Sequence, residues 1–408
     1  MSDISARSYR PTIRAAYVGY IVQAIVNNFL PLLFITVQRD WDIPLSRITF
    51  LITINFLIQL CVDVTSSKLV PKIGYRTAVT IAHFFAAAGM AALGILPFVL
   101  PDPYIGILIS IFLTAVGGGL IEVIISPIVE ACPTEDNKAG QMSFLHSAYC
   151  WGHVLVILLS TLYFVVFGTA NWRYMSFVWA LVPLINAFVF MKVPIRTLEE
   201  ESGGSMPIRR LIAAPVFWTL MLMMVCSGAA ETAMAQWASD FAEAGLGVSK
   251  TLGDLLGTCL FAVLMGVSRV IYASLSDRVD MSKYMIMSSL LCVVGYILSV
   301  FSPYPLLSLV GCGIIGFSVG IMWPGSYSIA AAAVKGGGTA MFALLALGGD
   351  LGCLSGPTMV GTVAGFFGGE LKAGLIWAII FPIGLIAGLI ICLRLTGKGH
   401  SDENGKQT

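Results

Sequence analysis

The chain has 408 residues, of which 57% are hydrophobic and 11% are charged, and its formal net charge is +1. Soluble proteins carry about 25% charged residues, so the composition excludes a water-soluble fold for most of the chain. The near balance of positive and negative charges gives no reason to expect a nucleic acid as a partner.

Twelve apolar runs, separated by charged residues or by proline and glycine, are each long enough to span a membrane as a helix. The sequence therefore predicts an all-α membrane protein with twelve transmembrane helices. No signal-peptide cleavage site follows the polar, basic N-terminal segment, so we expect the first helix to be retained. In chain order, the predicted helices cover residues 14–37, 48–69, 77–99, 104–129, 141–167, 172–193, 215–239, 251–275, 283–301, 305–332, 339–366 and 373–395.

The longest polar connection lies in the middle of the chain and divides the predicted helices into two sets of six. We expect an N-terminal six-helix bundle at 1–193, a central cytoplasmic loop at 194–214, and a C-terminal six-helix bundle with a short cytoplasmic tail at 215–408. The two halves also resemble each other, since the fourth and tenth predicted helices both contain a glycine-rich run that reaches a proline. Duplicated, pseudo-symmetric units of this kind are typical of secondary transporters.

The distribution of basic residues predicts the orientation in the membrane. Of the 23 lysines and arginines, seventeen lie in segments that are cytoplasmic if the N-terminus is cytoplasmic, and five lie in the opposite segments. Cytoplasmic loops are enriched in lysine and arginine. We therefore expect a multi-pass protein of the plasma (inner) membrane with both chain termini on the cytoplasmic side.

Five charged residues lie well inside the predicted helices. They are Asp63, Glu122, Glu231, Arg269 and Asp350. An ionisable side chain in the middle of a membrane helix costs roughly 2.5–3.5 kcal/mol on insertion scales, so it normally faces a cavity or a partner. Four acids and one base cannot all form ion pairs with one another. We therefore interpret the four acids as candidate proton-coupling groups.

Each of these charges also has a structural interpretation. Glu122 could belong to a locked ion pair, while Asp63 and Arg269 could form a salt link at the inner gate. Glu231 and Asp350 could line a cavity or pair with Arg269. The charged turns after the second and eighth predicted helices supply further candidates for gating or salt links, which are Lys72, Arg76, Asp277 and Arg278.

Polar side chains recur at helical spacing, which places them on one face of a helix. On the second predicted helix, for example, Asn55, Gln59 and Asp63 are four residues apart. Amides, hydroxyls and aromatic faces that line one cavity suit a neutral polyhydroxylated ligand, because they exchange hydrogen bonds with hydroxyls and stack on the apolar face of a sugar ring. The candidate solute-binding residues are Asn27, Asn28, Gln59, His146, Gln236, Trp237 and Trp323.

The histidines and cysteines give weaker indications. His146 could share a proton with Glu122 or could simply be hydrogen-bonded in the interior. His153 is a lesser candidate, and we expect no role for His83. The nine cysteines form no CxxC pair, so we interpret them as small buried residues. No HExxH, GxSxG or phosphate-loop motif occurs, and we therefore expect no enzyme, metal site or cofactor.

The two six-helix halves, the central loop and two sequence segments resemble the major facilitator superfamily, and this resemblance covers nearly the whole chain. The two segments are the turn "KIGYR" after the second helix and the segment "GVSRVIYASLSDRV" at the eighth helix. The second turn keeps the Asp-Arg pair of the family as Asp277 and Arg278, whereas Pro71 stands where the first turn usually carries an acid. The resemblance implies two six-helix bundles and a transport function.

Within that superfamily, the segments "VNNFLP" and "GGGLIEVIISPIVEA" resemble the fucose–proton symporter branch. This resemblance implies a sugar substrate, and it implies that Glu122 matches the glutamate implicated in proton coupling. The aspartate that the branch carries on its first helix has no counterpart, because Leu30, Pro31 and Leu32 fill that stretch. Asp63 is a candidate replacement for the missing acid.

We therefore expect a secondary transporter that moves a sugar or related polyol by alternating access with proton symport. The expected partners are a small solute, bound at mid-membrane between the halves, and the lipid bilayer. We expect a monomer to be functional, with a proton, or alternatively sodium, as the coupling ion. The alternatives are an exporter or antiporter of another small metabolite and, less favoured, a membrane sensor that binds solute without moving it.

Overall fold

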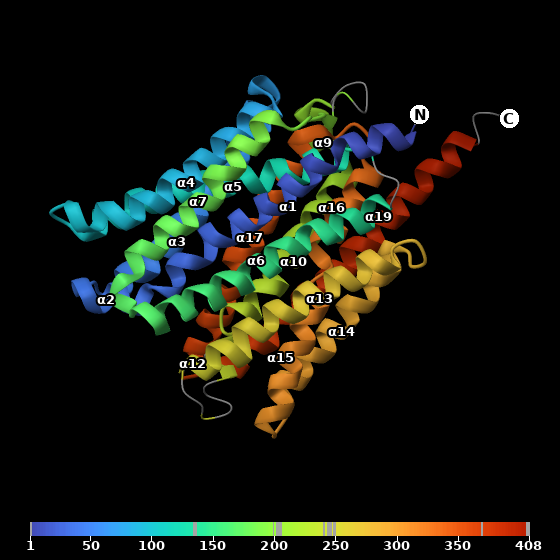
Figure 1. The fold of residues 1–408 in the computed structure, drawn as a ribbon. Helices are drawn as coiled ribbons and strands as arrows, with labels where there is room; N and C mark the ends of the chain where they lie inside the picture. Colours follow the sequence, from blue (N-terminus) through green and yellow to red (C-terminus); the bar gives the residue numbers. More distant parts are fainter. Residues whose placement is uncertain are drawn as a thin grey trace. The chain divides into compact units, whose positions relative to one another are not determined.

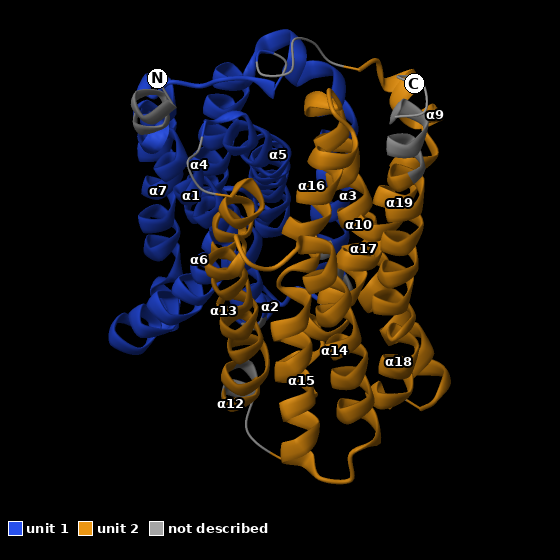
Figure 2. Ribbon diagram, turned by 90° about the vertical axis from the view of Figure 1, so that its right-hand side faces the viewer, with its two compact units in different colours: residues 1–135, 148–201 blue, residues 136–147, 202–408 orange. Residues whose placement is uncertain are grey.

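The computed structural model describes residues 2–133, 137–198, 200, 206–239, 241–242, 247, 250–368 and 370–404. The chain divides into two compact units, within each of which the residues contact one another: unit 1 contains residues 1–135 and 148–201, and unit 2 contains residues 136–147 and 202–408. Figure 2 colours the two units separately. Of the expected central loop at 194–214, residues 199 and 201–205 lie outside the described residues.

Unit 1 is built from long helices, labelled in Figure 1. In chain order they are α1 (Ser2–Leu32), α2 (Phe34–Trp41), α3 (Leu45–Ile73), α4 (Tyr75–Val99), α5 (Pro103–Ala131), α6 (Lys138–Phe167), the 3-10 turn η1 (Thr169–Asn171) and α7 (Trp172–Lys192). The first part of α6, up to residue 147, groups with unit 2. Helix α5 packs against α4, α3 and α1, which makes it the central helix of unit 1.

Unit 2 has the same helical character. Its elements are α9 (Ile208–Ala213), α10 (Pro215–Ala235), α12 (Lys250–Gly253), the π-helical turn η2 (Asp254–Cys259), α13 (Leu260–Leu275), α14 (Met281–Phe301), α15 (Pro305–Val319), α16 (Met322–Ala333), α17 (Gly338–Phe366), α18 (Leu371–Ala378) and α19 (Ile380–Asn404). Helix α10 packs against α17, α19, α16 and α15, so it holds the corresponding central place.

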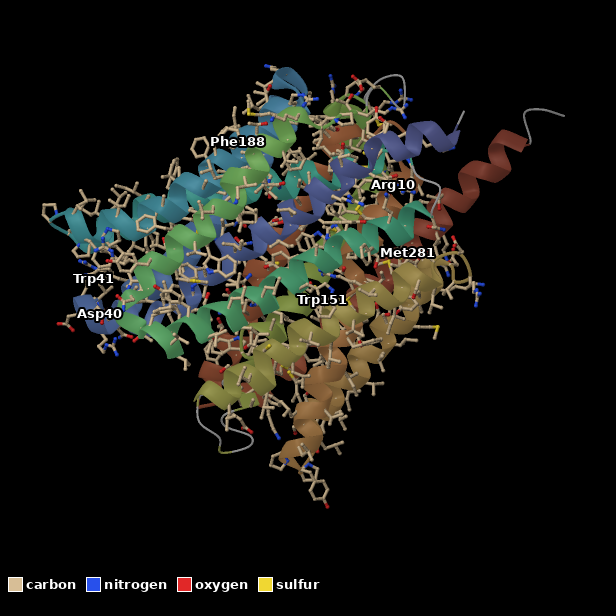
Figure 3. The ribbon with its side chains drawn as sticks, in the orientation of Figure 1. Arg10, Asp40, Trp41, Trp151, Phe188 and Met281 are labelled. Atoms are coloured by element: carbon tan, nitrogen blue, oxygen red, sulfur yellow. The ribbon has the colours of Figure 1, made fainter. Side chains whose placement is uncertain are left out.

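Among the described residues, eleven helical segments are long and apolar enough to cross a membrane. Helix α3 occupies the place of the remaining expected span, has 29 residues and carries the polar positions Asn55, Gln59 and Asp63. Large apolar side chains cover the outer faces of the helices: Phe188 is 52% exposed and Trp151 is 36% exposed, and both are labelled in Figure 3. The expected all-α membrane protein is confirmed.

The expected spans agree with the observed helices to within a few residues, except where a helix is interrupted. The span expected at 14–37 consists of α1 and α2, which are separated at Leu33. The span expected at 305–332 consists of α15 and α16, which are separated by Gly320 and Ile321. Pro31 and Pro324 lie close to these two breaks, and proline removes a helical hydrogen bond.

Close approach of the helix backbones requires glycine at the main helix contacts. A Cβ atom on Gly117 of α5 would lie 2.6 Å from the backbone nitrogen of Ala86 on α4. In unit 2, a Cβ atom on Gly356 of α17 would lie 2.5 Å from the carbonyl oxygen of Ala229 on α10. Small residues at such contacts allow membrane helices to pack without a hydrophobic driving force.

We predict that Gly356→Ala destabilises the protein by about 1–3 kcal/mol, because overpacking forces the two backbones apart. The matched control is Gly365→Ala on the same helix, where an added Cβ meets no atom within 4 Å. Thermal unfolding in detergent measures both variants. The packing account fails if Gly356→Ala unfolds at the wild-type temperature or if Gly365→Ala unfolds as early as Gly356→Ala.

Candidate functional site

Glu122 lies on α5 against the polar face of α1. The Gln23 side-chain nitrogen, Nε2, donates a hydrogen bond to Glu122 Oε2, and the two side chains are only 4% and 7% exposed. One turn before Gln23 on α1 and one turn after Glu122 on α5, the Tyr20 hydroxyl and Ser126 Oγ form a second hydrogen bond at 2.7 Å. Helices α1 and α5 are therefore joined by two adjacent buried polar contacts.

Three amide residues, which we call the amide cluster (Asn27, Asn28 and Gln59), lie near these contacts. Gln59 Nε2 donates to Asn27 Oδ1 at 3.0 Å. A Cβ atom on Gly118 would lie 3.7 Å from both of these amide atoms, so the glycine of α5 leaves space beside the pair. Asn28 Nδ2 donates to the carbonyl oxygen of Ala24 at 2.9 Å and to the Tyr149 hydroxyl at 3.4 Å.

Two buried acids of unit 1 lie on helices that pack at the amide cluster. Asp63 is fully buried on α3, one turn after Gln59, and Glu122 is one turn after Gly118 on α5. Unit 1 therefore combines two buried acids with three amides, on α1, α3 and α5. This set can accept and donate hydrogen bonds and can hold a proton, which are the requirements for coupling a polar solute to a proton.

Arg269 organises the charged part of unit 2. It lies on α13 and is 3% exposed. Its guanidinium donates from Nε to the carbonyl oxygen of Gly320 at 2.7 Å and from Nη1 to the carbonyl oxygen of His146 at 2.8 Å. Its Nη2 lies 3.6 Å from Glu231 Oε2 on α10. The structure thus places Glu231 beside Arg269, one of the two arrangements that the sequence left open.

Prolines explain why backbone carbonyls need these side-chain donors. In an α-helix the Gly320 carbonyl would accept from the residue four positions later, which is Pro324 and has no N–H. Arg269 supplies the missing donor at 2.7 Å. In the same way, Pro357 leaves the Cys353 carbonyl without its helical donor, and the Thr232 hydroxyl of α10 lies 3.3 Å from it. Lipid cannot satisfy such groups, so neighbouring helices do.

Aromatic rings and Asp350 lie near each other in the same unit. The Tyr327 ring has its centroid 5.7 Å from His146, 5.2 Å from Phe342 and 6.4 Å from Trp323. The indole of Trp323 packs directly on Gly349 of α17, which precedes the buried Asp350. Two expected site residues of unit 2, His146 and Trp323, therefore flank the Tyr327 ring, and Trp323 packs on the residue before Asp350.

Gln236 and Trp237 are placed differently. Gln236 is exposed just after the end of α10. The Trp237 indole nitrogen donates to the carbonyl oxygen of Pro357 at 3.3 Å, and the ring packs on Gly361. Trp237 is thus held against α17, where its position depends on a glycine.

The charged turn residues lie outside these clusters. Lys72, Asp277 and Arg278 are exposed. The Arg76 guanidinium donates to the carbonyl oxygens of Phe190 and Met191 at 3.0 and 2.8 Å, which are among the last carbonyls of α7. A cation favours the C-terminal end of a helix, so in this structure Arg76 caps α7. Its expected gating role stays a prediction.

His83 is fully buried on α4 and forms a polar contact with α7. Its Nδ1 is 2.8 Å from the Val79 carbonyl oxygen, and its Nε2 is 2.9 Å from Asn186 Nδ2 on α7, which also donates to the Ala15 carbonyl oxygen of α1. This arrangement matches a neutral ring that donates from Nδ1 and accepts at Nε2. Sequence analysis missed this contact, since nothing in the spacing pairs His83 with Asn186.

The sequence also missed Tyr149 and Thr232 as site residues. Tyr149 lies between His146 and His153 at helical spacing, and its ring centroid is 6.5 Å from that of His153. Thr232 lies four residues after Gly228, whose carbonyl it also contacts at 2.7 Å. Their positions on polar helix faces were the available signal.

Within the described residues, no group of three or more His, Cys, Asp or Glu side chains could hold a metal ion.

We predict that Arg269→Met destabilises the protein by about 3–5 kcal/mol, because it leaves a buried carboxylate without its counter-ion. The double variant Arg269→Met/Glu231→Met should recover part of this loss, since it removes the unpaired charge. Thermal unfolding of the two single variants and the double variant completes the cycle. If the effects of the single substitutions simply add, Arg269 and Glu231 are not coupled.

Comparison with known protein families gives a match along nearly the whole chain. The family model described as Major Facilitator Superfamily matches residues 16–258 and 240–408. Among curated protein sequences, none matches this chain at a significant level.

Solved structures of transporters share the fold. A structure of the E. coli fucose:proton symporter FucP has a TM-score of 0.79 at 15% sequence identity, over 94% of this chain and 99% of that chain. The proton:xylose symporter XylE bound to 6-bromo-6-deoxy-D-glucose has a TM-score of 0.81 at 13% identity, over 97% of each chain. The human organic anion transporter MFSD10 (TETRAN) has a TM-score of 0.73 at 16% identity, over 93% of this chain and 99% of that chain.

These low identities establish the fold alone, while the family model establishes membership. The resemblance to this superfamily in the sequence is confirmed. The chain belongs to the Major Facilitator Superfamily: it is a multi-pass membrane protein and a secondary transporter of small solutes, and it is not an enzyme.

Proposed function

We propose that this transporter carries a neutral polyhydroxylated solute, such as a sugar or polyol, in symport with a proton. The observation that carries the proposal is the position of Glu122, which is buried against Gln23 of α1, the helix that also carries Asn27 and Asn28 of the amide cluster. Helix α1 thus contacts the proton-binding group of α5 through Gln23 and also supplies two of the three amides that can hydrogen-bond hydroxyls. Two of the structural neighbours are sugar symporters by name, which supports the same solute class.

Amides suit a neutral solute because each one both donates and accepts hydrogen bonds. Asn27, Asn28 and Gln59 supply these groups in unit 1. In unit 2, His146, Trp323 and Gln236 are proposed as further contacts, and Trp237 is proposed as a stacking surface. Asp63, Asp350 and Glu231 are proposed as additional proton-binding groups.

In the proposed cycle, Glu122 first takes a proton from the outer side. Its neutralisation removes the cost of a buried charge at membrane depth and favours solute binding beside the amide cluster. The carrier then exposes the loaded site to the cytoplasm, where the solute and the proton leave. We propose that the bundles at 1–193 and 215–408 move as the two halves of this cycle, joined by the loop at 194–214.

The proposal includes a location and an orientation. We propose that both termini lie in the cytoplasm and that the protein acts as a monomer in the plasma membrane. The uneven distribution of lysine and arginine along the sequence supports this orientation. A proton is proposed as the coupling ion, because the buried carboxyl group of Glu122 can bind one.

A second candidate is a proton antiporter that exports a cationic metabolite. It is favoured by the residues of the interior: Asp63, Glu122 and Asp350 are buried, and Arg269 is the one buried lysine or arginine among the described residues. This excess of negative charge makes an organic anion a poorer ligand than a neutral or cationic solute.

We predict that the purified protein in proteoliposomes accumulates at least one of L-fucose, D-xylose, D-glucose and sorbitol when an inward proton gradient is applied. A gradient of one pH unit supports up to about tenfold accumulation if one proton moves with each solute. Glu122→Gln should abolish accumulation and retain counterflow exchange, because a permanently neutral side chain can bind solute but cannot release a proton.

The matched control is Glu370→Gln, since Glu370 is exposed at the start of α18 and should leave accumulation unchanged. Symport of a sugar or polyol is wrong if no compound of the panel responds to the gradient. Efflux of a cationic solute driven by the same inward gradient would instead support the antiporter.

A further inference from the structure

Gln23 has an unusual hydrogen-bonding state for a buried side chain. Its Nε2 donates to Glu122 Oε2, while its Oε1 is buried and has no hydrogen-bond partner within the described part of the chain. Buried polar atoms are nearly always paired, and an unpaired acceptor is costly. The Gln23 amide therefore holds one used donor and one unused acceptor beside the same carboxyl group.

The unused acceptor of Gln23 can bind a protonated carboxyl group. An ionised carboxylate only accepts hydrogen bonds, whereas a protonated carboxyl also donates one from its O–H. An amide presents NH2 on one side and C=O on the other, and rotating it by half a turn exchanges them. With NH2 toward Glu122 the amide matches the carboxylate, and with Oε1 toward Glu122 it matches the protonated acid.

We propose that Gln23 is the positioning residue for proton coupling, and that its amide reads the protonation state of Glu122 by rotating between these two orientations. The inference rests on the proposed function and deepens it. Each protonation state of Glu122 has a matching orientation of Gln23, so proton loading is accompanied by a local change on α1. That helix also carries Asn27 and Asn28 of the amide cluster, four and five residues further along the chain.

Among the described residues, four other titratable side chains are buried on the helices that pack against α5. Tyr20 on α1 is bonded to Ser126 at 2.7 Å. His83 on α4 has both ring nitrogens engaged, by Val79 and Asn186. Tyr75 is buried at the first residue of α4, and Asp63 is buried on α3. Asp63 is the neighbour whose charge can add to that of Glu122, so the test below includes it.

The test measures the protonation of Glu122 directly, without a solute. Infrared difference spectra of the full-length protein in lipid nanodiscs, recorded against pH, report the C=O stretch of a protonated carboxyl. The part of this signal that disappears in Glu122→Gln belongs to Glu122. Recording the same titration in Asp63→Asn separates the contribution of that neighbour.

We expect Gln23→Met to move the titration midpoint of Glu122 upward by about one pH unit, because the charge-assisted hydrogen bond that the carboxylate loses is stronger than the neutral one that the protonated acid loses. The C=O stretch of the protonated form should also move to higher frequency, since the acid loses its acceptor. Gln38→Met, the same change on α2, should titrate as wild type. Gln23→Glu should give a two-step titration, because two adjacent carboxyls share a proton.

A wild-type midpoint and a wild-type C=O frequency in Gln23→Met overturn the inference, as does a single-step, wild-type titration in Gln23→Glu. Two substitutions are used so that misfolding of one leaves the other to decide. The outcome is separable from that of the transport assay. Shifted titration without proton-driven uptake of any panel compound keeps the role of Gln23 and rejects the symport function, whereas uptake with an unshifted titration does the reverse.

Discussion

Lipid offers no hydrogen-bond partner, so every polar group on a membrane helix must be satisfied within the protein or face a cavity. The buried contacts of both units follow from this constraint. Arg269 donates to the Gly320 carbonyl that Pro324 leaves free, and the Thr232 hydroxyl meets the Cys353 carbonyl that Pro357 leaves free. Interrupted helices persist at membrane depth because side chains of neighbouring helices replace the missing donors.

The buried charges of units 1 and 2 have different partners. In unit 2, Arg269 lies beside Glu231 and bonds two backbone carbonyls, an arrangement that stabilises structure. In unit 1, Glu122 is bonded to a neutral amide, which can accommodate both protonation states. We propose Glu122, a buried carboxyl group that accepts a hydrogen bond from a neutral amide, as the group that gains and loses a proton during transport.

Much of the fold could be predicted from apolar runs alone, and much of the site could not. The run at 104–129 predicts α5 to within two residues because lipid imposes one length on every span. The interruption at Gly320 and Ile321 was missed, since it depends on a donor from a distant helix. Helical spacing shows that Gln59 and Asp63 share a face of α3, but it does not show which helix faces them. The contacts of Gln59 with Asn27 and of Gln23 with Glu122 therefore required the structure.

The central claim is that solute and proton move together through a carrier whose buried acid is neutralised in transit. The most direct test records external pH while a sugar flows down its own gradient into lightly buffered proteoliposomes to which no proton gradient is applied. The account predicts that the medium becomes more alkaline as solute enters, and that Glu122→Gln removes this change while exchange continues. Solute entry with no change in external pH, in the wild-type protein, would contradict it.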